Sequence, residues 1–494
     1  MTGYLQAATL QPMDTRATVA IAGATGFVGR ALAGSLVADY KVVGLSRVPP
    51  ARSDAIPAAP EEPVEWRRCD LFSLLEAEKA LAGAQSAFYL VHSMLSSARL
   101  TQGGFQDMDL VCADNFARAA AKAGVGQIVY LGGLIPDAPG LSRHLQSRLE
   151  VEATLGSRGV PVTALRAGII IGPGGSSYRI FSTLVERVPV IPCPSWTRSL
   201  TQPVALDDVL QLLRYCLKHP SPRSRSFDIG SPDVMSYREL LERTARSLGL
   251  ERVFVGVPAA GTFWFSRWLS LVSGAPQALV GPLLESVKHS MVCRDRRLQE
   301  EAEVPGIPFD VAVRAALARE KAIRRLDLPP SAPGRGSCPA LYRCDVRSVQ
   351  RMVLPPGKSA RWAAERYSCW LPRIFRTFLR AEADSLRNVR FRLLFPRVTL
   401  LYLAFARDRS QETDRQVFYI TGGLLARRIV RPTGRPRLEF REVLRGAALL
   451  VAIHDYRPTL PWPLYNATQA LVHLWVMRGF ARHLSGVARL GERP

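Results

Sequence analysis

Several patterns that assign proteins to familiar classes are missing from this chain of 494 residues. Its eight cysteines are scattered, with no C-x-x-C pair and no Cys and His spacing typical of zinc. Neither a metal site nor a disulfide framework is therefore predicted, and reduced thiols are expected. The amino terminus lacks a basic start followed by an apolar run and a small-residue cleavage site, so no secretory signal is expected. These absences predict a cytoplasmic protein.

Long apolar runs and nucleic-acid motifs are missing as well. No uninterrupted apolar stretch reaches about 18 residues, the length that a transmembrane helix needs. The nearest case, Phe263 to Val280, is broken by Arg267, serines and a proline, which predicts an amphipathic or core helix. The sequence contains no helix-turn-helix, zinc-finger or RNP-type aromatic motif, so nucleic acid is not an expected partner.

Positive charge is concentrated in the last third of the chain. Residues 341–494 hold 28 Lys and Arg against 11 Asp and Glu, which is +17 of the net charge of +23. A basic surface of this kind attracts anionic lipid or a phosphorylated ligand, and peripheral contact with an anionic membrane is one interpretation. The other is that the arginines lie on solvated faces of strands.

The most informative segment is an apolar strand, Val19–Ala22, that runs into closely spaced glycines and then into an Ala- and Leu-rich helix at Ala31–Val37. Glycine lets backbone N–H groups approach a pyrophosphate at a helix N-terminus, because no side chain blocks the way. Strand, glycines and helix in this order predict a dinucleotide site. Its expected cofactor-binding residues are Gly23, Thr25, Gly26, Phe27, Val28 and Gly29.

The end of the second strand indicates which dinucleotide is bound. An NAD site places Asp or Glu on the ribose about 20 residues after the glycines. This chain has Ser46 and Arg47 there, and a hydroxyl and a guanidinium suit a 2′-phosphate. NADP(H) is therefore predicted in preference to NAD(H). The alternative is that Arg47 is only a solvated side chain at a strand end. Asp70 and Leu71, after a third strand, are expected at the adenine. The Asp70 carboxylate would accept a hydrogen bond from the adenine amino group.

Short apolar strands alternate with helices through the first part of the chain, which predicts an α/β domain with a doubly wound parallel sheet over residues 15–327. Residues 328–340 are rich in Pro, Gly and Ser and predict a linker. Beyond them the pattern predicts a smaller α+β domain over residues 341–490. Its expected antiparallel sheet grips a long helix, Trp462–Leu484, and would enclose an apolar cavity; a packed core explains the same residues.

The motifs of residues 15–325 together resemble an atypical, NmrA-like or extended short-chain dehydrogenase/reductase. The segments that carry the resemblance are Gly23–Gly29, Cys69–Leu71, Tyr89–Met94, Val129–Leu134, Leu141–Arg148, Leu165–Gly168 and Pro282–Ser286. The chain also resembles a bacterial subgroup in which a DUF2867-type domain, similar to the helix-grip ligand-binding superfamily, follows. The resemblance implies an NAD(P)-binding Rossmann domain joined to a helix-grip-like domain.

The sequence departs from that family at the catalytic positions. The family carries a Ser after the fifth strand and a Tyr-x-x-x-Lys pair on the next helix. Here Gly132 and Gly133 stand at the Ser position, and His144 and Arg148 stand at the Tyr and Lys positions. They lie one helical turn apart, so His144 could donate a proton and Arg148 could hold the ribose. An adjacent cation disfavours imidazolium, and His144 could instead only line the pocket.

At the end of the fourth strand, Val91 and His92 are expected to face the nicotinamide, and His92 with Ser93 is the next candidate for a proton relay.

Three functions follow from these residues. The first is an NADP(H)-dependent oxidoreductase acting on a hydrophobic carbonyl compound or a related small molecule. The second is a non-catalytic NADP(H) sensor or scaffold of the NmrA type, which the missing catalytic residues favour. The third is a lipid carrier or peripheral membrane protein built on the basic last third.

Overall fold

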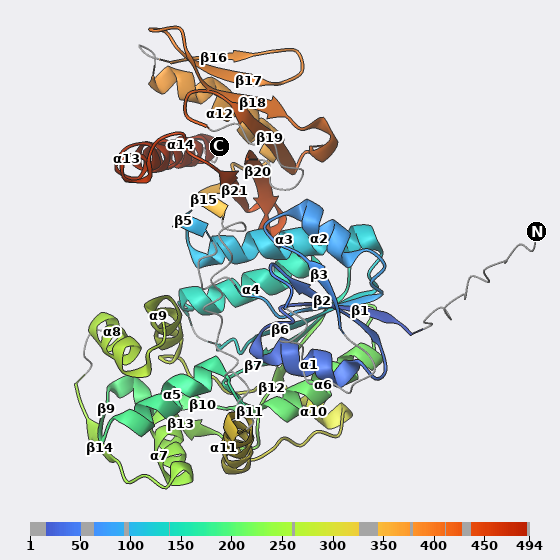
Figure 1. The fold of residues 1–494 in the computed structure, drawn as a ribbon, viewed down its shortest axis with the longest axis vertical. Helices are drawn as coiled ribbons and strands as arrows, with labels where there is room; N and C mark the ends of the chain where they lie inside the picture. The colour runs from blue at the N-terminus through green and yellow to red at the C-terminus, as the bar shows by residue number, and fades with distance from the viewer. Residues whose placement is uncertain are drawn as a thin grey trace, which may run out of the picture.

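The fold is given by a computed structural model that describes residues 16–50, 64–92, 98–137, 139–258, 262–325, 344–375, 379–410, 412–426 and 436–491. Within these ranges two large sheets organise the chain (Figure 1). The predicted linker 328–340 and the candidate Ser93 lie outside the described residues. No helix of the described ranges is both long and apolar enough to cross a membrane.

A seven-stranded parallel sheet forms the centre of the first domain, in the order β12-β7-β6-β4-β1-β2-β3. The strands are β1 (Thr18–Ala22), β2 (Lys41–Ser46), β3 (Glu65–Arg68), β4 (Ser86–Tyr89), β6 (Gln127–Gly133), β7 (Val162–Ala167) and β12 (Arg225–Ile229). In the inner strands β1, β2, β4, β6 and β7, side chains enter two different cores, one on each face of the sheet. The predicted α/β class with a doubly wound parallel sheet is confirmed.

Helices cover both faces of this sheet. The core of one face is shared with α2 (Leu74–Leu81), α3 (Phe105–Ala123) and α4 (Arg143–Leu155). The other face packs against α1 (Phe27–Leu36), α6 (Leu206–Lys218) and α10 (Arg297–Glu301). The turn from β1 into α1 therefore lies at the carboxyl edge of the sheet, where ligands of such folds bind.

A third core belongs to what we call the small lobe, a group of short strands and helices beside the sheet. It comprises β8 (Ile170–Ile171), α5 (Ser176–Arg187), β9 (Val190–Cys193), β10 (Leu200–Thr201), β11 (Val204–Ala205), β13 (Met235–Ser236), α7 (Tyr237–Leu248), β14 (Val253–Gly256), α8 (Thr262–Ser273), α9 (Gln277–Ser286) and α11 (Phe309–Arg325). The single helix expected around Phe263–Val280 is two helices, because Gly274 adopts a left-handed conformation and Pro276 follows it.

The second domain is built on an eight-stranded mixed sheet, in the order β16-β17-β18-β19-β20-β21-β15-β5. Its elements are β15 (Cys344–Val353), α12 (Ala360–Ile374), β16 (Leu379–Ala383), β17 (Val389–Leu393), β18 (Thr399–Phe405), β19 (Arg415–Gly422), β20 (Arg437–Val443), β21 (Ala448–Tyr456), α13 (Trp462–Ala467) and α14 (Gln469–Gly491). The eighth strand, β5 (Ala98–Gln102), comes from the first domain and pairs in parallel with β15. The helix predicted over Trp462–Leu484 is interrupted at Thr468, whose backbone is not helical.

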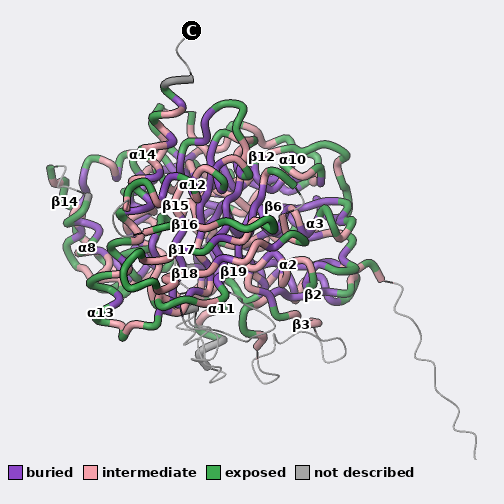
Figure 2. Tube along the Cα trace, turned by 90° about the horizontal axis from the view of Figure 1, so that it is seen from above, coloured by how far each residue is buried: buried purple, intermediate pink, exposed green. Residues whose placement is uncertain are grey.

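The two faces of the second sheet pack against different elements. Because side chains alternate along a strand, neighbouring residues of one strand contact different elements. Leu438 and Phe440 of β20 and Leu449 of β21 pack against α12 and α14, in a core of apolar and aromatic side chains. In that core the rings of Tyr367 on α12 and Phe480 on α14 lie 5.1 Å apart. The intervening residues, such as Leu450, share a core with the helices of the first domain. Figure 2 shows buried chain in elements of both domains.

Arginines on that second face meet carboxylates of the first domain. Arg441 of β20 contacts Asp114 of α3 at 2.8 Å, and both side chains are buried. Arg351 of β15 contacts Asp107 of α3 and Glu150 of α4, each at 2.8 Å. The interpretation that these arginines lie on solvated strand faces is wrong for this face, because the first domain covers it.

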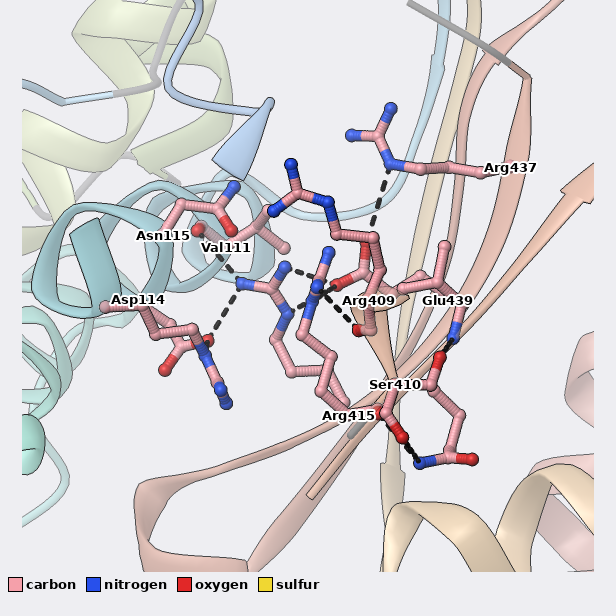
Figure 3. A network of polar contacts seen from close by, with 12 residues as sticks. Val111, Asp114, Asn115, Arg409, Ser410, Arg415, Arg437 and Glu439 are labelled. Carbon is pink, nitrogen blue, oxygen red and sulfur yellow. Dashed lines mark hydrogen bonds and ion pairs between the residues drawn. The ribbon is translucent and has the colours of Figure 1, made fainter. Parts of the chain in front are cut away.

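Glu439 lies at the centre of this interface (Figure 3). It is fully buried and receives Arg415 at 2.7 Å as well as Arg441. Burial alone would raise the pKa of Asp114, but the guanidinium groups of Arg441, Arg118 and Arg158 lower it to about 2. The stabilisation that comes from this shift is complete above about pH 4 and is lost as the pH falls towards 2.

Replacing Arg441 with Met should therefore destabilise the whole chain, because it leaves two buried carboxylates with one cation fewer. We expect the free energy of unfolding to fall by about 3 kcal/mol, measured by urea denaturation followed by fluorescence. The control is Arg238→Met, which removes an exposed ion pair with Glu242 and should cost about 0.5 kcal/mol. Equal losses in the two variants would contradict a stabilising role for the buried network.

Candidate nucleotide site and cavity

The turn after β1 has the geometry that the glycine spacing predicts. Gly23 adopts φ +89°, and a Cβ placed on it would lie 2.8 Å from the carbonyl oxygen of Leu90. A Cβ on Gly29 would lie 2.1 Å from the carbonyl oxygen of Gly23, which is closer than atoms can approach. The N–H of Gly26 donates to that same oxygen at 2.9 Å and closes the turn. Glycine is thus required at two of the three positions.

The N-terminus of α1 is left open towards a cavity. Its N-cap residue, Gly26, provides no side-chain oxygen, and the first turn of the helix contains no acidic residue. The first backbone N–H groups of the helix have no partner within it. Gly26, Phe27, Val28 and Gly29 all line the cavity. Bare amides and the positive end of a helix dipole fit a pyrophosphate, so the residues present suit a dinucleotide.

Other predicted cofactor residues lie at strand ends near this turn. Arg47 follows β2 and is exposed, as a residue that meets a 2′-phosphate would be, while the Ser46 hydroxyl donates to the carbonyl of Val48 at 2.7 Å. The carboxylate of Asp70 accepts from Arg347 of the second domain at 3.1 Å and from the N–H of Phe72 at 3.2 Å. Asp70 was expected at the adenine, and it also links this loop to the second domain.

A cavity of about 330 Å³ begins at the glycine turn and continues into the small lobe. The wall away from the turn is formed mainly by apolar side chains of α5, α8 and α9: Ile180, Phe181, Leu269, Leu279, Val280, Leu283 and Leu284. The lining residues that the structure describes all fall between Gly23 and Met291, so they belong to the first domain and the small lobe. The second domain is not among the walls described.

Between the glycine turn and the apolar wall lie His92, His144 and Arg148, three predicted site residues that the structure brings together. Arg148 is buried and paired with the buried carboxylate of Asp109 on α3. Ser147 also donates to Asp109, at 3.0 Å. Arg148 is therefore held in place by a charge from a neighbouring helix, and its aliphatic stem faces Gly133.

Both histidines at this end of the cavity are held neutral. Burial and the charge of Arg148 lower the pKa of His144 to about 3, and the same two causes lower the pKa of His92. His92 is nevertheless open to the cavity. The Nδ1 atom of His144 is buried without a hydrogen-bond partner among the described residues. Near neutral pH these side chains can donate or accept a hydrogen bond but do not carry charge.

Three residues of this region escape sequence reasoning. Asp109 lies within a helix where its neighbours suggest only an amphipathic pattern, yet it is 1% exposed. Tyr89 and Tyr130 end in the core beneath Arg148, and the Tyr130 hydroxyl donates to the Arg148 carbonyl at 3.3 Å. The buried Tyr89 hydroxyl has no partner in the described part of the chain. A polar residue at a core position of α3 was the available signal for Asp109.

Comparison with known proteins supports the cofactor domain. Residues 19–139 match the model of the NAD dependent epimerase/dehydratase family. That region is a Rossmann-like NAD(P)-binding fold, and a nicotinamide nucleotide is its cofactor type. A DUF2867-type second domain is not shown by these comparisons, and neither is a preference for NADP.

Two curated relatives match parts of the chain. A ceramide reductase of Caulobacter vibrioides is 26% identical over 248 residues, which cover 50% of this chain and 76% of that protein. The auxiliary protein GraX of Staphylococcus aureus is 28% identical over 144 residues, or 29% of this chain. The match spans only 42% of GraX.

Solved structures align with about three-fifths of the chain. A nucleoside-diphosphate-sugar epimerase from Staphylococcus aureus is 13% identical with a TM-score of 0.48, covering 60% of this chain and 99% of that one. An NADPH-dependent quinone oxidoreductase from Escherichia coli, solved with NADPH, is 18% identical with a TM-score of 0.47, covering 60% and 98%.

Substituting Ala for Gly29 should abolish nucleotide binding, because its Cβ would collide with the backbone of the turn that faces the pyrophosphate. We expect the dissociation constant for NADPH to rise at least 10-fold, measured by calorimetry on protein whose circular dichroism is unchanged. Gly486→Ala on α14 is the matched control, since nothing lies within 4 Å of its added Cβ. Undiminished binding by Gly29→Ala would contradict the assignment of this turn.

Proposed function

We propose that the chain is an NADP(H)-dependent oxidoreductase that acts on a hydrophobic carbonyl compound. The observation that carries this proposal is one cavity that joins a bare helix N-terminus, three polar side chains and an apolar wall. A pyrophosphate at α1 places the far end of a dinucleotide towards His92 and His144. The apolar wall then provides space for a substrate beside the cofactor, shielded from water.

The residues of the chain divide the work of such a reaction. When bound, the nicotinamide supplies or accepts a hydride at the carbonyl carbon. The α1 amides would hold the pyrophosphate, and Arg148, which lines the cavity and is held by Asp109, would contact the ribose. A neutral imidazole N–H, of His144 or His92, donates a hydrogen bond to the carbonyl oxygen. His92 is open to the cavity, so the proton that the oxygen finally takes can be replaced from water.

The nature of the substrate is proposed from the wall. Leucine, isoleucine, valine and phenylalanine side chains of α5, α8 and α9 leave few hydrogen-bonding groups for a sugar hydroxyl, and they favour an apolar chain or ring. One curated relative is named a ceramide reductase, and a lipid-like carbonyl compound agrees with this wall. Cys69, Cys193, Cys216, Cys293 and Cys369 are free thiols, which agrees with a reducing compartment such as the cytoplasm.

A second candidate is a sensor or scaffold that binds NADP(H) without turnover. The observation that favours it is the polar end of the cavity, where His144 and Arg148 stand in place of the Tyr and Lys of active relatives. The pKa of His144, about 3, makes it a weak acid catalyst compared with a Tyr activated by Lys. Binding and turnover must therefore be measured separately.

The proposed turnover is tested by following NADPH oxidation with a panel of long-chain ketones and aldehydes. Leu283→Glu should raise KM for the longest substrates at least 10-fold, because it places a charge in the apolar wall, and should spare NADPH binding. Leu386→Glu, at an exposed position of the second domain, is the matched control and should change neither. His144→Ala should lower kcat.

Binding of NADPH with no turnover of any substrate in the panel would contradict the enzyme and favour the sensor. If Leu283→Glu leaves turnover unchanged, the substrate does not contact this wall.

The proposed choice of NADP(H) is tested at Arg47. Replacing it with Glu puts a carboxylate where the 2′-phosphate would lie, so the affinity for NADPH should fall about 10- to 100-fold while the affinity for NADH holds or rises. The measurement is calorimetric titration with both nucleotides. Arg361→Glu, at an exposed position of α12 in the second domain, serves as a control for general charge effects. An unchanged ratio of the two affinities in Arg47→Glu would overturn the preference.

A further inference from the structure

The outer side of α8 is apolar although it faces solvent. Phe263, Trp264 and Leu271 are 60%, 72% and 81% exposed, and together with Arg267 they form what we call the α8 stripe. Their positions recur every three or four residues, so they share one side of the helix. Large side chains at such exposure cost free energy in water unless something covers them.

A second stripe of the same kind lies on α13 and α14. Leu464, Leu471, Val472 and Trp475 are exposed there, and Arg478 and Arg482 continue along the same helix. We call these residues the α14 stripe. Figures 1 and 2 agree in placing α8 and α13 towards the same side of the molecule, the left in both views. Two helices with exposed apolar side chains, from different domains, thus lie towards one side of the molecule.

The charge of these helices is positive throughout. Thr262–Ser273, Trp462–Ala467 and Gln469–Gly491 contain no Asp or Glu, whereas arginines lie in or beside both stripes. The guanidinium of Arg267 lies 5.8 Å from the ring centre of Phe263. Exposed Trp, Phe and Leu flanked by Arg is the composition of helices that lie in the headgroup region of an anionic bilayer. A partner protein would need an equally extended acidic and apolar surface.

The inner sides of the same small-lobe helices form the cavity wall. Leu269 of α8 and Leu283 of α9 face the cavity, while Leu271 of α8 faces out. The distance from the outer stripe to the cavity is therefore one helix thickness, about 10 Å. A surface that holds a bilayer at this position would bring the site close to apolar compounds dissolved in it.

We propose that the α8 stripe and the α14 stripe together dock the protein on the surface of an anionic phospholipid bilayer, without crossing it. Trp264, Phe263, Leu271 and Trp475 enter the headgroup and upper acyl region, and Arg267, Arg478 and Arg482 contact lipid phosphates. The docking does not depend on the proposed reaction, because both stripes lie outside the nucleotide site.

The test is co-sedimentation of the full chain with vesicles of phosphatidylcholine alone or with 30% phosphatidylglycerol. The chain should partition onto the anionic vesicles at least 10-fold more strongly than onto the neutral ones, and added salt should weaken the binding. The double variant Trp264→Glu with Leu271→Glu should reduce partitioning at least 10-fold. Trp475→Glu alone should reduce it by a smaller factor. Val311→Glu, at an exposed position of α11, is the matched control and should bind normally.

Three further measurements distinguish bilayer docking from nucleotide binding and from dimer formation. NADPH affinity should be unchanged in every stripe variant, which separates this proposal from the function of the site. Brominated lipids should quench tryptophan fluorescence in the wild type, and less in Trp264→Phe, if the stripe enters the bilayer. Full vesicle binding by the Glu variants would overturn the proposal, as would a wild-type dimer in solution that the same substitutions convert to a monomer.

Discussion

Pairing of buried arginines with buried carboxylates is the interaction on which the arrangement of the two domains depends. One face of the second sheet presents five arginines that pair with carboxylates. Three of them, Arg347, Arg351 and Arg441, find acidic partners on helices or loops of the first domain. The other two, Arg415 and Arg437, pair with Glu439 and Asp455 of the second sheet itself. A buried guanidinium without a carboxylate is strongly unfavourable, so few relative orientations of the two domains satisfy them all. Part of the positive charge in the last third of the chain is thus buried and paired with carboxylates inside the molecule.

The same contacts bear on the nucleotide cavity. Helices α3 and α4 carry Asp109 and Arg148 on the side of the cavity, and they carry Asp107 and Glu150 on the side of the second domain. Arg351 binds both Asp107 and Glu150 and so ties the two helices together, two residues along each helix from Asp109 and Arg148. The second domain contributes no described wall to the cavity, but it contacts α4, which lines the cavity, and α3, whose Asp109 holds Arg148. Its contact with Asp70 reaches the loop after β3 in the same way.

Local chemistry made part of this structure predictable. The glycine turn, the parallel strands and the antiparallel pairing within the second sheet follow from short-range patterns. Interruptions within helices were missed at Gly274 and Thr468, since the apolar pattern runs on across both. Burial of the basic strand face could not be read from the sequence, because alternating Arg is equally typical of a solvated face. Asp109 and β5 acquire their roles only from residues distant in the chain.

Strand β5 makes the second sheet depend on a segment of the first domain. Residues 98–102 complete the edge of a sheet whose other strands begin more than 240 residues later. A chain severed between residues 325 and 344 would leave β15 with an open hydrogen-bonding edge and would uncover a sheet face lined with arginines. Neither portion could then be exchanged between genes as an independent module, so recombination would have to transmit both together.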